Sequence, residues 1–440
     1  MPSPPTSSAV ADLGEVQPNG SRQLGRRSGV CLDGDAVVAG LADGTVAAFD
    51  ASLDERWRNE GDSDRGSVVA LAPFAGGVLA GERGAAGEIR LHDRDTGAVR
   101  WRYRTADDVG VPQKHTRFYL PFVVDIAVPD ADGESAFVAA RRYERGPDGG
   151  RCFRSVVYAV GPDGSVAWRH EADASPISLA VDGGDRLAVA YNRCPGDWDA
   201  GLVVLDPETG RGRRRWDPPG DGDRRVGDVA LAPGGVVAAS HADYRGYCLD
   251  GDGVRWAVDL GRPVEHGGGG GGDATGEPAQ ETVYAYPNHV HATAEGAVFV
   301  VGNTYPEGDD RETELRHPNE HTAVGVTASG DTAFVDAVGG FAHEIAARDD
   351  CVAVPVAQHF RDRDPDRHGV RRYDVAGGPT VARSVPGVVT AAALGDECSA
   401  REGGGRSDCG SRVAVVEEPV TYHDNSDDGP LGAYRLRLFD

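Results

Sequence analysis

The sequence predicts an all-β chain folded as a single β-propeller of eight four-stranded blades, with seven blades as the alternative. Three observations support this prediction. Short runs of alternating apolar residues flank Asp-Gly turns, which is the pattern of β-hairpins. A tryptophan recurs at the end of such a pair of strands, as in residues 156–168, VVYAVGPDGSVAW. No long stretch has apolar residues at helical spacing.

The repeat accounts for the blades in order along the chain. A propeller blade has four strands, and its sequence unit recurs at a fairly regular spacing. The first five blades are predicted at 30–60, 67–105, 122–172, 175–218 and 226–261, and they contain Trp57, Trp101, Trp168, Trp216 and Trp256. The sixth blade, 288–338, has Phe334 in that place, the seventh, 342–385, has no equivalent, and the eighth begins near residue 388.

The two ends of the chain are predicted to close the ring together. The last segment supplies only three strands, so we expect residues 12–17 to pair beside the C-terminal strand as the fourth. Closure of this kind removes open sheet edges that would invite aggregation. Residues 1–10 are expected to be disordered, and residues 262–282, with six consecutive glycines, to form a flexible loop. The whole of 1–440 is therefore predicted to be one domain.

The chain is strongly acidic, with a formal net charge of -25, and Lys114 is its only lysine among many arginines. An acidic surface that uses arginine in place of lysine is typical of proteins from salt-loving archaea, so we expect a halophilic, haloarchaeal protein. High-GC codon bias explains the arginines but not the excess of acids. The negative field repels nucleic acid and anionic membranes, and neither is expected as a partner.

The compartment is predicted from the first residues and the cysteines. Residues 1–16 show neither the basic nor the apolar region of a secretory signal, and no 18-residue apolar run is present. The seven cysteines are scattered and never spaced CxxC, so we expect mostly reduced thiols in a cytoplasmic monomer. Cys398 and Cys409 share one glycine-rich loop, where a disulfide is the alternative to two free thiols.

One phrase within the repeat carries a family resemblance. Residues 205–216, LDPETGRGRRRW, and residues 92–101, HDRDTGAVRW, both place an aspartate before a Thr-Gly pair and a tryptophan after it. This phrase resembles the repeat of PQQ-like, or quinoprotein-type, β-propeller proteins, and weaker copies cover most of the chain. The resemblance implies that the tryptophans dock neighbouring blades and are structural. Large rings with one N–H donor suit such a buried contact.

The resembling family implies two functional types, PQQ-dependent dehydrogenases and scaffold proteins such as an outer-membrane assembly lipoprotein. This chain departs from both types. No two cysteines are adjacent, as they are in the methanol-type dehydrogenases, and the first cysteine, Cys31, follows no apolar leader. We therefore predict a non-enzymatic binding or scaffold module, rank a PQQ-dependent dehydrogenase last, and do not expect PQQ as a cofactor.

Long polar loops are predicted on one face of the ring, which is expected to bind a protein or a small molecule. Histidines and aspartates gather at the channel mouth on this face. Aligning the inner strands of the sixth and seventh blades places His289 and His343 at equivalent positions, at the same depth in the channel. The equivalent positions in the third and fifth blades are Asp125 and Asp228. His291 points the same way as His289. The candidate ligand-binding residues, including two that follow second strands, are His289, His291, His343, Asp125, Asp228, His359 and His241; His423 also follows a second strand.

Two chemistries are open for these residues. His289 and His343 are the predicted ligands of a possible divalent metal such as Zn²⁺, Mn²⁺ or Fe²⁺, and a metal-dependent enzyme using the channel-mouth residues is the alternative function. We favour a structural role, in which they line the channel and bond to neighbouring blades. Arginines and a tyrosine on the same face are candidates for binding an anion, or for surface ion pairs: Arg141, Arg142, Tyr143, Arg193 and Arg361.

Overall fold

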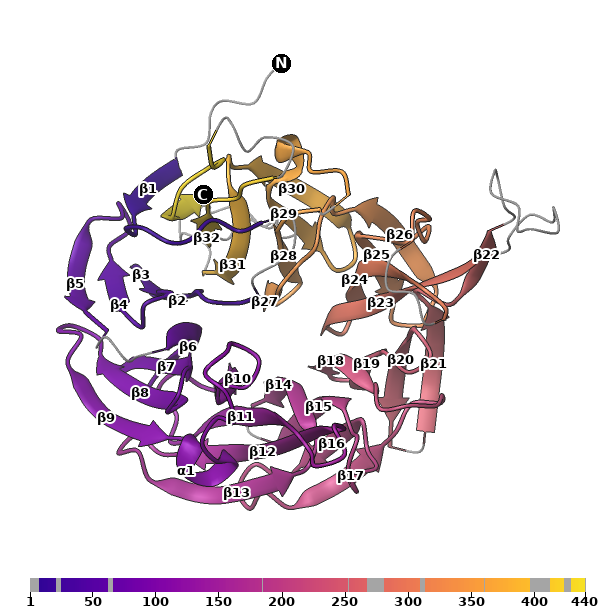
Figure 1. Cartoon of the computed structure of the whole chain (residues 1–440), viewed down its shortest axis with the longest axis horizontal. Helices are drawn as coiled ribbons and strands as arrows, with labels where there is room; N and C mark the ends of the chain where they lie inside the picture. The colour runs from indigo at the N-terminus through magenta and orange to yellow at the C-terminus, as the bar shows by residue number, and fades with distance from the viewer. Residues whose placement is uncertain are drawn as a thin grey trace.

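The computed structural model describes residues 8–20, 25–61, 66–183, 185–251, 253–266, 281–308, 313–359, 361–395, 412–422 and 429–439. These residues form a nearly all-β ring of antiparallel sheets around a central channel (Figure 1). In each four-stranded unit the first strand lies toward the channel and the last toward the rim. The predicted all-β propeller is confirmed.

The first half of the described ring contains four units of four strands. Their bounds are β2 (Gly29–Asp33), β3 (Ala36–Gly40), β4 (Val46–Phe49) and β5 (Glu55–Asn59); β6 (Ser67–Phe74), β7 (Gly77–Arg83), β8 (Glu88–Asp93) and β9 (Val99–Arg104); β10 (Phe122–Ala127), β11 (Ala136–Arg145), β12 (Arg151–Val160) and β13 (Val166–Ala172); and β14 (Ser175–Asp182), β15 (Arg186–Arg193), β16 (Leu202–Leu205) and β17 (Gly212–Trp216). One pair, Phe122 with Arg83, joins β10 to β7 and merges the second and third units into one sheet.

The second half follows the same order. Its strands are β18 (Val226–Ala232), β19 (Gly235–Ser240), β20 (Arg245–Asp250) and β21 (Gly253–Asp259); β22 (Val264–His266), β23 (Glu281–Ala292), β24 (Gly296–Pro306), β25 (Thr322–Thr327) and β26 (Thr332–Ala337); β27 (Ala346–Arg348), β28 (Cys351–Val356), β29 (Gly369–Asp374) and β30 (Gly378–Ser384); and β31 (Val388–Leu394), β32 (Val413–Glu418), β33 (Arg435–Phe439) and β1 (Ser8–Asp12). The number of blades in the whole chain, eight or seven, stays a prediction.

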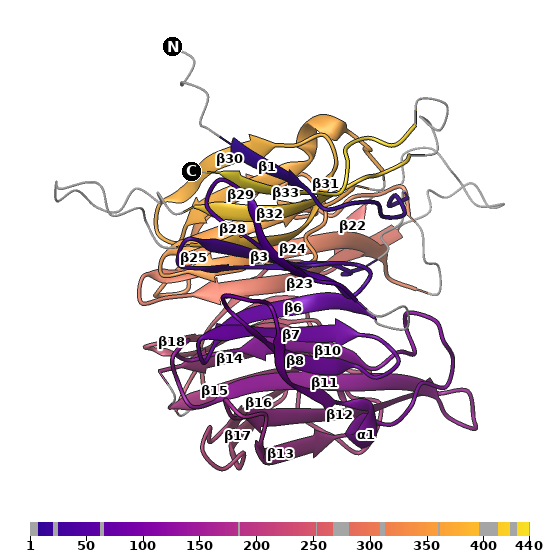
Figure 2. The same cartoon turned by 90° about the vertical axis from the view of Figure 1, so that its left-hand side faces the viewer.

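The ring is closed by β1, which pairs antiparallel with β33 (Figure 2). The predicted kind of closure is therefore right, but of the predicted residues, 12–17, only Asp12 belongs to the pairing strand, and residues 8–10 are not disordered. The cause is local. Ala9 and Ala11 pack against the core between the first and last units, while Gly14, at φ +99, turns the chain out of the extended conformation.

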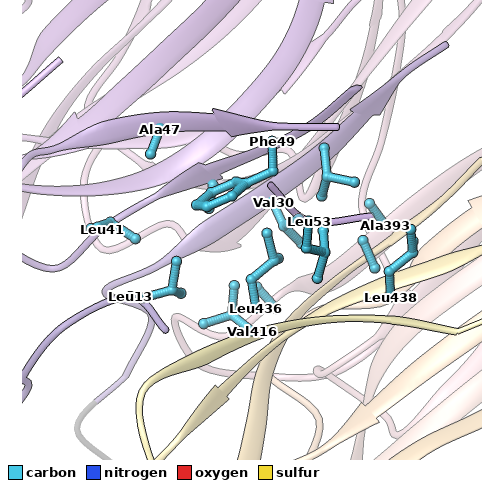
Figure 3. Close-up of a cluster of buried hydrophobic side chains, with 14 of the residues drawn as sticks. Leu13, Val30, Leu41, Ala47, Phe49, Leu53, Ala393, Val416, Leu436 and Leu438 are labelled. Atoms are coloured by element: carbon cyan, nitrogen blue, oxygen red, sulfur yellow. The ribbon is translucent and has the colours of Figure 1, made fainter. Parts of the chain in front are cut away.

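A cluster of buried apolar side chains seals this junction (Figure 3). Leu13 follows β1, and Phe49 and Leu41 come from the first unit, while Leu436 and Leu438 come from β33. All five side chains are at most 6% exposed. Each buried leucine or phenylalanine contributes on the order of 1.5–3 kcal/mol, so the first and last units are held together by the hydrophobic effect as well as by strand pairing.

The tryptophans dock each blade onto the next, as predicted. The Trp168 indole N–H donates to the carbonyl of Pro207 at 2.8 Å, in the turn of the following unit. Gly210 of that turn has φ +67, and a Cβ there would lie 2.5 Å from the Trp168 ring. The glycine of the repeated phrase is thus required by close packing and a left-handed backbone. The same arrangement joins Trp57 to Arg94 and Gly97, and Trp101 to Pro162 and Gly164.

Two predicted loops are partly strands. Residues 141–153 form most of a long hairpin, because β11 and β12 stay paired from Ala136–Val160 out to Arg145–Arg151. In the predicted glycine-rich loop, 264–266 pair with 281–283, and residues 267–280 lie outside the described part of the chain. The loop after β9 contains the short helix α1 (Ala106–Val109), and η1 (Pro365–Arg367) is a single 3₁₀ turn. Among the described residues no helix is long and apolar enough to cross a bilayer.

The cysteines only partly follow the prediction of reduced thiols. Four of those in the described residues are free: Cys31, Cys152, Cys194 and Cys248. Cys351 is disulfide-bonded, so the prediction is wrong for that residue. Cys398 and Cys409 lie outside the described residues. The cytoplasmic location stays a prediction.

Candidate functional site

The channel holds a cavity of about 790 Å³, which brings together most of the predicted site. Its wall is made of inner strands and of the loop-side ends of second strands. Six of the seven candidate residues line it: Asp125, Asp228, His241, His289, His291 and His343. His359 does not; it lies in a separate cluster between the sixth and seventh units.

The two aspartates tie neighbouring blades together. Asp125 Oδ2 accepts the backbone N–H of Leu179 in the next unit at 2.7 Å. Asp228 Oδ2 likewise accepts the N–H of Val290 at 2.8 Å. In each residue the other oxygen accepts the N–H of the following residue at 2.8 Å. Burial raises the pKa of Asp125 to about 6. Both carboxylates are therefore occupied as inter-blade hydrogen-bond acceptors.

The predicted alignment of His343 is wrong by one residue. In the seventh unit Glu344 does what the aspartates do: its Oε1 accepts the backbone N–H of Ala392 in the next unit at 3.4 Å. Glu344, not His343, is thus the equivalent of the aspartates. In the seventh unit the inner strand pairs only over Ala346–Arg348 and has no β-bulge there, whereas the sixth has one between Pro287 and His289, so the two strands do not align residue for residue.

The channel histidines contact backbone carbonyls rather than one another. His289 Nε2 lies 3.1 Å from the carbonyl of Ala342, and His291 Nε2 lies 2.7 Å from that of Asp349. His241 Nε2 lies 3.1 Å from the carbonyl of Pro287. Since a carbonyl only accepts, each Nε2 carries the hydrogen. His289 Nδ1 is also 3.7 Å from Asp228 Oδ2. These contacts support the structural role, and metal binding by His289 and His343 stays a prediction.

His343 differs from the other channel histidines. Its Nε2 is buried and has no hydrogen-bond partner among the described residues. The ring packs edge-on against Phe341, with centroids 5.2 Å apart. Burial and the nearby charge of Arg26 lower the pKa of His343 to about 3, so the imidazole is neutral at physiological pH. His343 therefore keeps one buried polar atom without a partner, on a residue that lines the cavity.

Arginines at the loop-side end of the cavity complete the site. Arg26, Arg83, Arg141 and Arg224 line it, and sequence reasoning singled out only Arg141. Arg83 and Arg141 occupy equivalent positions in the second strands of neighbouring units, so an alignment of the blades could have grouped these two. Arg26 and Arg224 lie outside the strands, and no repeated position marks them. Other predicted anion-binding residues have partners of their own: Arg142 with Glu144, Arg193 with Asp223, Arg361 with Glu320, and Tyr143 against Tyr119 and Phe153.

A second polar cluster joins the sixth and seventh units. Glu320 and His321 end the insertion between β24 and β25, and His359 follows β28; one atom from each lies within 4.8 Å of the others. Burial raises the pKa of Glu320, but hydrogen bonds from His359 and Thr304 dominate and lower it to about 2. Sequence reasoning missed Glu320 and His321, although the adjacent Glu-His pair before a strand was a visible signal. His423 lies outside the described residues.

The hydrogen-bond pattern decides what this second cluster does. His359 Nδ1 accepts two backbone N–H groups, from Arg361 and Asp362, each at 3.1 Å. The ring hydrogen therefore sits on Nε2, which lies 3.3 Å from Glu320 Oε1. A protonated ring nitrogen has no lone pair for a metal. The geometry is that of a buried hydrogen-bonded link between two blades.

Comparisons with known proteins support the fold. No family model matches the chain, and no curated protein matches its sequence. Among solved structures, BamB from Moraxella catarrhalis is similar over 98% of this chain and 100% of its own, with a TM-score of 0.52 and 13% identity. Quinohemoprotein alcohol dehydrogenase from Comamonas testosteroni is similar over 99% of this chain and 76% of its own, with a TM-score of 0.55 and 11% identity. These likenesses show a PQQ-like propeller fold, and identities this low show the fold alone.

Proposed function

We propose that the protein is a non-enzymatic binding module that holds a ligand on its loop-rich face, over the mouth of the channel. The observation that carries this proposal is that the channel carboxylates already accept hydrogen bonds from other groups of the protein. Asp125 and Asp228 accept backbone N–H groups with both oxygens, and Glu344 bonds to Ala392 and Arg26. A general base needs a carboxylate or imidazole within reach of the proton that it takes, and these groups are already engaged in holding blades.

The shape of the molecule favours binding on one face. Connections from second to third strands and from fourth to first strands emerge on the same side of a propeller. That side carries α1, the extended β11–β12 hairpin and the insertion between β24 and β25. A cavity of about 790 Å³ is within the size range of small-molecule sites. A protein loop inserted into the mouth, or a small ligand, would each fit this proposal.

The test measures ligand binding, and it also looks for chemical conversion of the ligand and for retention of a cofactor. Purified protein is screened by thermal shift against neutral sugars, amino acids, carboxylates and phosphates, and ligands that raise the melting temperature are followed by NMR of the ligand. We expect at least one concentration-dependent rise in melting temperature with no chemical change in the ligand. Consumption of the ligand would contradict a non-enzymatic module.

The second search concerns cofactors. Adding PQQ and Ca²⁺ should produce neither cofactor absorbance nor dye reduction, and incubation with EDTA should leave the melting temperature unchanged. Stoichiometric retention of PQQ with dye reduction would place the protein among the dehydrogenases. A fall in melting temperature with EDTA, reversed by Zn²⁺ or Mn²⁺, would favour the metal-dependent alternative.

A further inference from the structure

Three arginines at the channel mouth have no carboxylate to neutralise them. Arg83 ends β7, Arg141 lies in β11, and Arg224 precedes β18; all three line the cavity. Among the described residues none of them forms an ion pair. Arg26 beside them is different, because its Nη1 lies 3.0 Å from Glu344 Oε2. The mouth therefore carries positive charge in excess.

Aromatic rings support these guanidinium groups without neutralising them. The Arg83 Cζ lies 3.8 Å from the centroid of Phe122, and the Arg141 Cζ lies 5.3 Å from the same ring. The Arg224 Cζ lies 4.5 Å from the centroid of Tyr286. Such cation–π contacts use the face of the guanidinium and leave its N–H donors in the plane. Arg83 Nη1 donates to the carbonyl of Arg26 at 3.2 Å, and the remaining donors of these groups are available to a ligand.

The arrangement is unfavourable as it stands. Burial and the charges of Arg141, Arg26 and Arg117 lower the pKa of Arg83 well below its usual value. Burial and the charge of Arg193 lower the pKa of Arg141 to about 10. The Arg141 Nε is buried and has no hydrogen-bond partner among the described residues. A buried charge without a partner is destabilising.

Scarcity of carboxylates cannot explain this gap, because the chain contains 70 Asp and Glu residues against 45 Lys and Arg. Arginines elsewhere on the surface do find partners. Arg213, for example, lies 2.6 Å from Asp206 at a turn on the opposite face of the ring. At the mouth, by contrast, Arg83, Arg141 and Arg224 pair with none of the acids that line the same cavity. Asp125 and Asp228 accept backbone N–H groups and Glu344 pairs with Arg26, so a partner for the three arginines is best supplied from outside.

We propose that Arg83, Arg141 and Arg224 bind a small multivalent oxyanion, carrying carboxylate or phosphate groups, inside the channel mouth. The inference rests on the proposed binding function and names its ligand class. Guanidinium forks match the two oxygens of a carboxylate or phosphate. The unpartnered Nε2 of His343, on the wall of the same cavity, adds a neutral donor when it carries the hydrogen.

The surface charge selects for a small ligand. A net charge of -25 repels large polyanions before they reach the mouth. A small anion meets that field briefly and then enters a cavity where the local charge is positive and weakly screened. An acidic peptide that inserts a single side chain is the macromolecular outcome of the experiment below.

The experiment is calorimetric titration of the whole protein with citrate and, separately, with pyrophosphate, at one fixed salt concentration. The two arms distinguish a carboxylate from a phosphate ligand, and an acidic peptide is titrated in a third. We expect saturable binding of at least one probe by wild type, and at least tenfold weaker binding by Arg83→Gln/Arg141→Gln. Arg213→Gln is the matched control and should bind as wild type does. Arg141→Lys keeps the positive charge but loses the paired N–H donors of the guanidinium group. Its affinity for the probe should lie between those of wild type and the double variant.

Two results would overturn the inference: no binding of any probe by folded wild type, or equal binding by wild type and the double variant. Circular dichroism confirms that each variant is folded. The proposed function fails separately. Binding of a neutral ligand at the mouth, without binding of any anion, would support the binding module and contradict the oxyanion site. Turnover of a bound anion would support the oxyanion site and contradict the non-enzymatic function.

Discussion

The outer ring of docking contacts and the channel mouth are built in opposite ways. In the docking ring Trp57, Trp101 and Trp168 each find a backbone carbonyl at 2.7–2.9 Å. At the mouth Arg83 and Arg141 have no ion-pair partner among the described residues. The extent of repetition distinguishes them. The docking contacts recur along the chain, whereas among the described units an arginine stands at the equivalent position of the second strand only in two neighbouring ones, as Arg83 and Arg141. The difference teaches that repeated positions in this chain maintain the fold, and that the unrepeated mouth is where binding is expected.

The comparison predicts that damage to the closure of the ring has the largest effect. Deleting residues 1–13 removes β1 and Leu13 from the core shown in Figure 3. The loss of a buried leucine and of five paired residues should lower the free energy of unfolding by about 3–5 kcal/mol. Urea denaturation measures it, and deletion of residues 1–7, which leaves β1 intact, is the control. Equal midpoints for the two deletions would refute the closure.

The next effect is expected at the docking ring. Gly210→Ala places a Cβ 2.5 Å from the Trp168 ring and imposes a side chain on a backbone at φ +67. We expect destabilisation of about 2–4 kcal/mol by denaturant midpoint. Gly212→Ala, two residues along, is the matched control because a Cβ there meets nothing within 4 Å. If both variants lose the same stability, close packing is not what the repeated glycine provides.

Acid should weaken the blade contacts that involve buried histidines. Burial lowers the pKa of His241, His321 and His343 to about 3. Because the unfolded chain binds protons at these sites below pH ~6.5 and the folded chain does not, stability present above pH ~6.5 is lost as the pH falls toward 3. Each buried histidine corresponds to a loss of about 2 kcal/mol between pH 7 and pH 5.

One carboxylate opposes this trend. The pKa of Asp125 is raised to about 6, so its contribution is present at low pH and is lost as the pH rises through 6. Three histidines outweigh one aspartate, and we expect the urea midpoint to fall from pH 7 to pH 5. His343→Gln should flatten the dependence. A midpoint that rises on acidification would show that the histidines are not buried in neutral form.

Much of this architecture could be predicted from the sequence because it repeats. Alternating strands around Asp-Gly turns, and Trp168 with the Thr-Gly before Trp216, are local patterns that recur along the chain. The single-residue displacement of His343 could not be predicted, because residue types do not show which inner strands contain a β-bulge and which, like that of the seventh unit, do not. The grouping of Arg83 with Arg141 follows the repeat, because both stand at the same step of a second strand. Arg224 lies in a connection outside the repeat, so its place beside them could not be predicted.

The smallest expected effect is also the most direct test of the central claim, that the mouth is built for binding and not for stability. The measurement is the denaturant midpoint of Arg83→Gln/Arg141→Gln against wild type, without any ligand. Removing two mutually repelling buried charges should leave stability unchanged or raise it by up to about 1 kcal/mol, because the lost cation–π contacts offset part of the relief. A fall of 2 kcal/mol or more in the double variant would contradict the claim, and would place these arginines with the docking contacts as structural residues.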